Sequence, residues 1–68
     1  MNQTFVSIPI GRTFLRLTDG HKFIKLPRYL DADSEEEYNA ICLDYLYAHE
    51  ALQWFDPEEQ VIPIEENL

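Results

Sequence analysis

Apolar and polar positions alternate through residues 13–26 on both sides of an Asp-Gly pair, and this pattern predicts a β-hairpin. Asp19 and Gly20 would occupy the centre of a type I′ turn, where both central residues have positive φ. With this short loop, Leu15 would pair with Ile24. Side chains alternate across a strand, so one face is aliphatic and is expected to face the core: Leu15, Leu17, Ile24 and Leu26. The other face is aromatic and basic and could be open to solvent: Phe14, Phe23, Arg16, Lys25, Thr18 and His21.

The segment before the hairpin is also predicted to be β-structure. Residues 4–10 alternate so that Val6, Ile8 and Ile10 point one way. This strand would end, or run along a sheet edge, at Pro9, because proline cannot donate to a ladder.

Three signals mark the ends of the hairpin and the loop after it. Gly11 and Arg12 predict a bend into the first strand. Pro27 is expected to stop the second strand, since the residue before a proline is restricted and its nitrogen lacks a hydrogen. Residues 28–37 are rich in acids and show no apolar period, so we expect a solvated loop there.

Two structures compete for residues 34–49. Ser34 and Glu37 have the spacing of a capping box, and a helix would place one stripe of side chains together: Tyr38, Ile41, Cys42, Tyr45, His49 and Leu52. As strands, residues 38–44 and 51–55 would be joined by a turn. In the helix, Leu43 and Tyr47 would lie outside this apolar stripe. The helix and the strand interpretations both stay open here.

The C-terminal part favours β-structure. Asp56 and Pro57 hold the first two positions of a type I turn. Residues 61–64 would then form a short strand, and Pro63 predicts that it lies at an edge. We therefore expect a mainly β single domain over residues 1–68. It would be an SH3-like barrel or a twisted antiparallel sheet of about five strands, with a short helix within residues 34–49 as the alternative.

Composition and charge bound the function. The chain has 68 residues, 46% of them hydrophobic, which is enough for a packed core. The single cysteine, Cys42, excludes an internal disulfide and fits a reducing compartment. The N-terminus lacks a signal-peptide pattern, and no apolar run is long enough to span a membrane. These features predict a cytoplasmic protein with no membrane partner.

Charge is distributed unevenly along the chain. Residues 1–28 carry five bases and one acid, a balance of +4, whereas residues 29–68 carry −12, which gives the net charge of −8. Folding would interleave part of this charge, but the acidic excess cannot be neutralised internally. Direct binding to nucleic acid is not expected, because Lys and Arg supply most of that affinity.

Four stretches resemble small proteins of bacteriophage type: IPIGRTF, KFIKLP, YNAICLD and WFDPEEQVIPI. In such proteins these segments are successive strands of a small SH3-like barrel. The chain departs from that pattern at residues 45–50, where a short glycine-containing turn would be expected. Small phage proteins of this kind include inhibitors of host defence nucleases, so the resemblance implies an anti-CRISPR-like role in the host cytoplasm.

The residue types that usually perform chemistry are poorly placed for it. His21 and His49 are not in a metal-ligand spacing, and His21 is expected to be an exposed neighbour of the turn. Cys42 lies among apolar residues and is expected to be buried and inert. The acids of residues 31–37 lack the calcium loop with its central glycine. We predict no enzyme, no cofactor and no metal.

Binding to a protein is the remaining prediction. Acidic residues and exposed aromatic residues form the expected partner surface: Asp31, Asp33, Glu35, Glu36, Glu37, Tyr38, Trp54, Glu58 and Glu59. Alternation allows only one of Trp54 and Phe55 to face the core. The expected partner is a larger protein with a basic surface, such as a nuclease or another nucleic-acid enzyme. The alternative is a structural protein that self-associates, for example as a homodimer, through an edge strand at residues 61–64.

Overall fold

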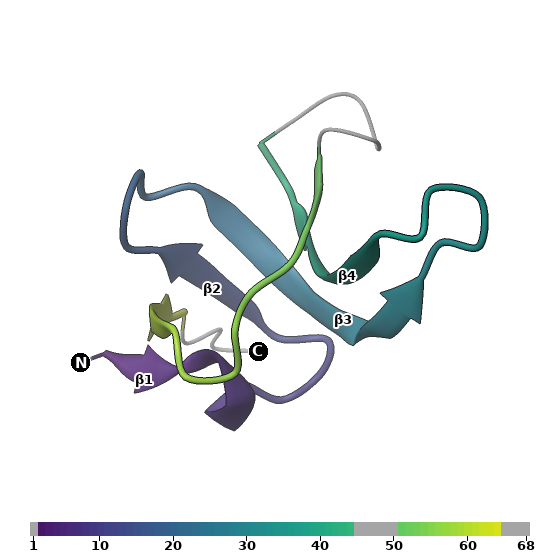
Figure 1. Ribbon diagram of the computed structural model, residues 1–68. Helices are drawn as coiled ribbons and strands as arrows, with labels where there is room; N and C mark the ends of the chain where they lie inside the picture. Colours follow the sequence, from purple (N-terminus) through teal and green to yellow (C-terminus); the bar gives the residue numbers. More distant parts are fainter. Residues whose placement is uncertain (1, 45–50, 65–68) are drawn as a thin grey trace.

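The computed structural model describes residues 2–44 and 51–64, which form one antiparallel sheet of six strands in the order β1-β6-β2-β3-β4-β5 (Figure 1). The elements are β1 (Gln3–Thr4), a 3-10 turn η1 (Phe5–Ser7), β2 (Thr13–Arg16), β3 (Lys22–Leu30), β4 (Glu37–Cys42), β5 (Leu52–Gln53) and β6 (Gln60–Pro63). The sheet does not close into a barrel. The prediction of a mainly β fold is therefore confirmed, in its twisted-sheet form and with six strands.

All four phenylalanines of the chain meet in the core. The Phe55 ring lies 5.2 Å from that of Phe5 in a stacked arrangement, and 5.1 and 5.0 Å from the rings of Phe14 and Phe23 in edge-to-face arrangements. Offset-stacked and edge-to-face pairs are the favoured geometries of aromatic rings. Phe55 belongs to the connection from β5 to β6, and Figure 1 shows this connection crossing the face of the sheet. This aromatic cluster is the centre of the fold.

The predicted core face of the hairpin was the wrong face. Phe14 and Phe23 are fully buried, whereas Leu17 on the expected core face is 45% exposed. The two basic residues on the aromatic face reach its rim through their alkyl stems: the Arg16 guanidinium lies 4.7 Å from the Phe23 ring centroid, and the Lys25 ammonium 4.5 Å from that of Phe5. Long cationic side chains can cover apolar surface and bind an aromatic face at once.

The hairpin turn also differs from the prediction. Leu15 pairs with Lys22 rather than with Ile24, so the loop is wider than two residues. The Gly20 amide donates to the Arg16 carbonyl, and Gly20 has a φ of 73° while Asp19 does not have positive φ. The Asp19 carboxylate pairs with Arg16 and accepts the amide hydrogen of His21. These side-chain bonds favour the wider loop over a type I′ turn.

Pro27 does not end the second strand of the hairpin. The register between β3 and β4 shifts between the pairs Lys25–Ala40 and Tyr29–Tyr38, so three residues of β3 lie opposite Asn39 alone. A proline inside such a bulge breaks no ladder hydrogen bond. β3 therefore continues to Leu30, and the solvated loop predicted for residues 28–37 is shorter, because both of its ends belong to strands.

The N-terminal strand prediction was largely wrong. Only Gln3–Thr4 is strand, and the 3-10 turn after it directs Phe5 and Ile8 into the core while Val6 and Ile10 are each 62% exposed. The amides of Phe5 and Val6 donate to carbonyls in residues 57–59, which ties this turn to the β5–β6 connection. The predicted bend is confirmed, and Gly11 has a φ of 89° there.

The strand interpretation of residues 38–44 is confirmed, since Glu37–Cys42 form β4 and no helix is present in residues 34–44. Residues 45–49 of the alternative helix lie outside the described residues. The turn at Asp56 is confirmed by the bond from the Glu59 amide to the Asp56 carbonyl, 3.0 Å long. Within residues 2–44 and 51–64, no helix is long and apolar enough to cross a membrane.

The prediction that residues 61–64 form an edge strand was wrong. β6 lies between β1 and β2, and Val61 pairs with both Gln3 and Arg16. Pro63 is tolerated because it occupies a non-hydrogen-bonded position opposite Phe14, and the next ladder bond comes from the Ile64 amide to Thr13. The edges of the described sheet are instead β1 and β5, each two residues long.

Candidate functional site

The bulge in β3 opens an apolar groove on the sheet. Its lining is Leu26, Pro27, Arg28, Tyr29, Tyr38 and Leu52. A second, shallow groove adjoins it and is lined by Glu36, Glu37, Tyr38, Leu52, Gln53 and Trp54. Because both grooves contain Tyr38 and Leu52, they form one continuous surface. We call it the aromatic surface, and its most accessible rings are Tyr29, 58% exposed, and Trp54, 43% exposed.

The acidic loop, residues 31–36, borders this surface and is held in one shape by its own backbone. The Asp31 amide donates to the Glu36 carbonyl, and the Glu35 amide donates to the Asp31 carbonyl, each at 2.8 Å. The Asp31 carboxylate accepts the Asp33 amide at 2.9 Å. An aspartate that bonds the backbone two residues on is typical of an Asx turn. The loop therefore presents its acids in a defined arrangement.

Three of the predicted acids near this loop are used internally. Glu37 forms a two-bond ion pair with Arg28, at 2.7 and 2.9 Å, and this raises the pKa of Arg28. Glu36 accepts the hydroxyl hydrogen of Tyr38 at 2.6 Å, which raises the pKa of that tyrosine. Asp31 is occupied by the loop itself.

The other two acids of the loop, Asp33 and Glu35, are open to solvent. Both are exposed, and neither carboxylate forms a hydrogen bond or ion pair within the part of the chain that the structure describes. Glu35 has a φ of 60°, the left-handed conformation that favours glycine or asparagine. A glutamate at this position is therefore locally unfavourable for the backbone.

Trp54 is directed to the surface by its neighbour Phe55. Phe55 is buried, and its backbone is held by the buried Asn39 side chain, which accepts from the Phe55 amide and donates to the Phe55 carbonyl, both at 2.8 Å. The amide side chain therefore takes the place of a paired strand. Alternation then exposes Trp54, whose indole nitrogen donates to Asp56 at 3.3 Å. The prediction that one of the two rings is accessible is confirmed.

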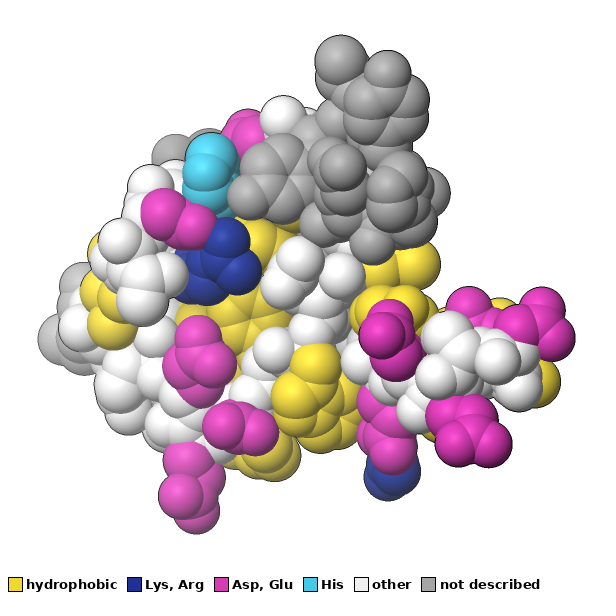
Figure 2. Space-filling model, turned by 45° about the horizontal axis from the view of Figure 1, so that its top comes forward, with side chains coloured by type: hydrophobic (Ala, Val, Ile, Leu, Met, Phe, Trp, Pro, Cys, Tyr) yellow, Lys and Arg dark blue, Asp and Glu magenta, His cyan; other side chains and the backbone are white. Residues whose placement is uncertain are grey.

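The remaining predicted acids do not join the acidic loop. Glu58 and Glu59 lie on the turn before β6 and line neither groove of the aromatic surface. Figure 2 shows acidic side chains on the projecting β3–β4 connection and a second group across the molecule, with hydrophobic side chains between them. Tyr45, Tyr47, Glu65 and Glu66 lie outside the described residues.

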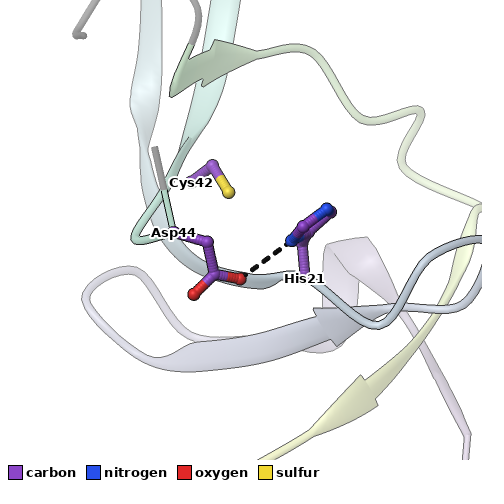
Figure 3. Close-up of side chains that lie close together, drawn as sticks. All are labelled: His21, Cys42 and Asp44. Atoms are coloured by element: carbon purple, nitrogen blue, oxygen red, sulfur yellow. Dashed lines mark hydrogen bonds and ion pairs between the residues drawn. The ribbon is translucent and has the colours of Figure 1, made fainter. Parts of the chain in front are cut away.

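The structure also brings together a group that sequence spacing did not reveal. His21, Cys42 and Asp44 each offer one metal-ligand atom, and the three atoms lie within 4.8 Å of one another (Figure 3). His21 is half-buried rather than exposed, with Nδ1 3.0 Å from Asp44 Oδ2. Cys42 is buried, as predicted. These residues meet only because Phe23 pairs with Cys42, a register that no local signal in the sequence reports.

Asp44, two residues after the end of β4, is stabilised as a carboxylate anion. Its Oδ2 accepts the Lys22 amide hydrogen at 3.0 Å, and this bond, together with His21, lowers the pKa of the carboxyl group below its ordinary value. Asp19 lies on the other side of the histidine, with Oδ2 3.9 Å from Nε2. The Arg16 guanidinium beside Asp19 lowers the pKa of that carboxyl group to about 2.

Comparison with known proteins found no matching family model, no matching curated protein and no matching solved structure. The resemblance to proteins of bacteriophage type therefore stays a prediction.

Proposed function

We propose that this chain is a non-enzymatic binding module whose acidic loop and aromatic surface cover a basic surface of a larger nucleic-acid-handling protein. It would act as an inhibitor of the anti-defence type, in the cytoplasm of the host cell. The observation that carries the proposal is the arrangement at the β3–β4 connection, where a loop with two exposed carboxylates borders the exposed rings of the aromatic surface. Aromatic anchors within a charged rim are typical of the residues that dominate binding energy at interfaces.

The distribution of internal ion pairs supports an acidic binding surface. Among the described residues, Lys and Arg form side-chain ion pairs only in Arg16–Asp19 and Arg28–Glu37. Lys25 is directed inward, with its ammonium 3.0 Å from the Phe5 carbonyl. In the part of the chain that the structure describes, the acids outside these two pairs keep their charge for solvent or for a partner. A negative field of this kind accelerates encounter with a basic surface and opposes nucleic acid.

The rigid shape of the loop adds a second argument. Its backbone bonds and Asx turn order the acids before a partner arrives, so less conformational entropy is lost on binding. The positive φ of Glu35 also supports a binding role for this loop, because strained backbone conformations cluster at functional sites.

A tagged pull-down from bacterial lysate, eluted with salt and then with DNA, tests the proposal. We expect a partner that DNA displaces and that is released between about 0.1 M and 1 M salt, over which the Debye length falls from about 10 Å to about 3 Å. The double variant Asp33→Asn/Glu35→Gln and the single variant Trp54→Ala should each lose this partner. These side chains are exposed, so circular dichroism should show that the variants stay folded.

The matched control changes the net charge by the same amount elsewhere. Asn2→Lys/Thr18→Lys likewise shifts the net charge by +2, at exposed positions outside the aromatic surface, and should keep the partner. If both double variants lose it equally, overall charge rather than this site controls binding. A partner that is indifferent to salt and DNA, or recovery of the chain alone, would contradict the proposal and favour assembly between copies.

A further inference from the structure

We infer that His21, Cys42 and Asp44 form a binding site for a divalent metal ion of the Zn²⁺ class. Figure 3 shows the three side chains close together: His21 immediately precedes β3, Cys42 ends β4, and Asp44 follows it two residues later. The site is independent of the acidic loop and of the aromatic surface, because none of its residues lines either groove.

The donor set selects the class of metal. A thiolate, an imidazole and a carboxylate together suit borderline ions such as Zn²⁺ or Co²⁺, whereas Ca²⁺ and Mg²⁺ take oxygen ligands. On binding, the Cys42 thiol would release its proton to solvent and bind as the thiolate. Three protein ligands leave the fourth tetrahedral position for water.

The spacing of the ligand atoms is close to that of a tetrahedral site. Metal bonds of about 2.0–2.3 Å place neighbouring ligand atoms about 3.3–3.6 Å apart. The three atoms lie within 4.8 Å of one another, and the His21 and Asp44 atoms are already 3.0 Å apart. Asp44 is exposed and His21 is half-buried, so both side chains can move the short distance needed to coordinate an ion. Cys42 stays fixed in the core.

The surroundings of His21 match those of a metal-bound histidine. With Nδ1 directed at Asp44, the other ring nitrogen, Nε2, lies 3.9 Å from Asp19. A metal-ligating histidine commonly has its second nitrogen oriented by a carboxylate, and Arg16 holds Asp19 in place. The same geometry argues against a Cys-His-Asp catalytic relay. In such a relay the nitrogen opposite the aspartate faces the nucleophile, but here it faces a second carboxylate.

Titration of the full chain with Co²⁺, followed by absorbance under reducing conditions, tests the site. We expect one equivalent to produce the thiolate-to-cobalt charge-transfer band and the intense visible bands of a tetrahedral ion, and one equivalent of Zn²⁺ to remove them. Zn²⁺ should also raise the midpoint of thermal unfolding, because an ion that binds only the folded chain stabilises it. Cys42→Ala should abolish the charge-transfer band.

A second variant keeps the test independent of the core position of Cys42. His21→Gln changes a half-buried side chain, should fold normally by circular dichroism, and should lose at least tenfold in Co²⁺ affinity. The control Asp56→Asn removes one carboxylate outside the site and should leave both the affinity and the spectrum unchanged. An octahedral cobalt spectrum without a thiolate band in the parent chain, or equal affinity in the parent and His21→Gln, would overturn the inference.

Discussion

Replacing Asn39 by alanine should destabilise the fold more than any other single change of a polar side chain on β4. The Asn39 amide makes both of its hydrogen bonds, each 2.8 Å long, to the backbone of Phe55. Asn39 is 6% exposed and Phe55 is 1% exposed, so water cannot readily replace the lost partner. Alanine would leave one buried N–H and one buried C=O without a hydrogen bond.

The expected loss can be estimated from these two groups. A buried group left without its partner costs about 1–3 kcal/mol, so the two together cost about 2–6 kcal/mol. Typical stability is about 0.05–0.15 kcal/mol per residue, or about 3–10 kcal/mol in total for a chain of 68 residues. The variant should therefore lose a large part of the total stability, and it could be partly unfolded without denaturant.

Urea unfolding, followed by fluorescence of the single tryptophan and by far-ultraviolet circular dichroism, measures this loss. Trp54 is adjacent to Phe55 and reports directly on that segment. The control Asn2→Ala makes the same substitution at an exposed position and should change the free energy of unfolding by less than about 0.5 kcal/mol. A loss for Asn39→Ala within that same range would refute the role assigned to the amide.

The variant Asn39→Asp separates the two hydrogen bonds. One carboxylate oxygen can still accept from the Phe55 amide, but the other would face the Phe55 carbonyl without a proton to donate. The pKa of this buried carboxyl group should be raised, so the folded variant binds its proton more tightly than the unfolded chain does. Relative to the parent, its stability should therefore be low at pH 7 and recover as the pH falls toward about 4, the ordinary pKa of aspartate. A stability difference that does not change with pH would contradict this account.

Three further predictions concern the loops and their borders. Glu35→Gly should leave stability unchanged or raise it by up to about 1 kcal/mol in urea unfolding, because relief of the left-handed conformation offsets the entropy of glycine; a clear loss would contradict the strain argument. Gly20→Ala, with a φ of 73° at that position, should cost about 1–2 kcal/mol in the same assay, and no loss would mean that the turn relaxes. In alkaline titration by ultraviolet absorbance, subtracting Tyr38→Phe from the parent should isolate a tyrosine with a pKa above its ordinary value of 10.0, and Glu36→Gln should lower it. Because that pKa is raised in the folded state, its contribution to stability is complete below about pH 10 and is lost as the pH rises through the raised value.

The fold was predictable where local chemistry decides it. Strand positions rich in β-branched and aromatic residues, the bend at Gly11 and the turn at Asp56 all result from backbone preferences that act over a few residues. The choice of core face was not predictable in this way. Both faces of the hairpin are apolar enough to be buried, and the aromatic one is favoured by the distant partner Phe55 together with the positions of Arg16 and Lys25 at the rim.

The same limit applies to the candidate sites. The exposed ring of Trp54 and the acids of the loop could be predicted, since alternation and charge are properties of neighbouring residues. The group of His21, Cys42 and Asp44 could not, because it depends on the register between β3 and β4. For Pro63 the local signal was misleading. Its missing N–H predicted an edge strand, but a non-hydrogen-bonded position inside the sheet satisfies the same constraint.

The bulge in β3 connects the fold to the proposed function. Three residues of β3 lie opposite Asn39, and the Asn39 side chain is bonded to the β5–β6 connection. Asn39 then binds the Phe55 backbone, which directs Phe55 into the core and Trp54 outward. The bulge residues line the apolar groove together with the pair Tyr29–Tyr38 that follows them. The Asn39–Phe55 bonds and the apolar groove therefore both lie at this one irregularity in the ladder, so variants that regularise β3 should lose stability and the aromatic surface together.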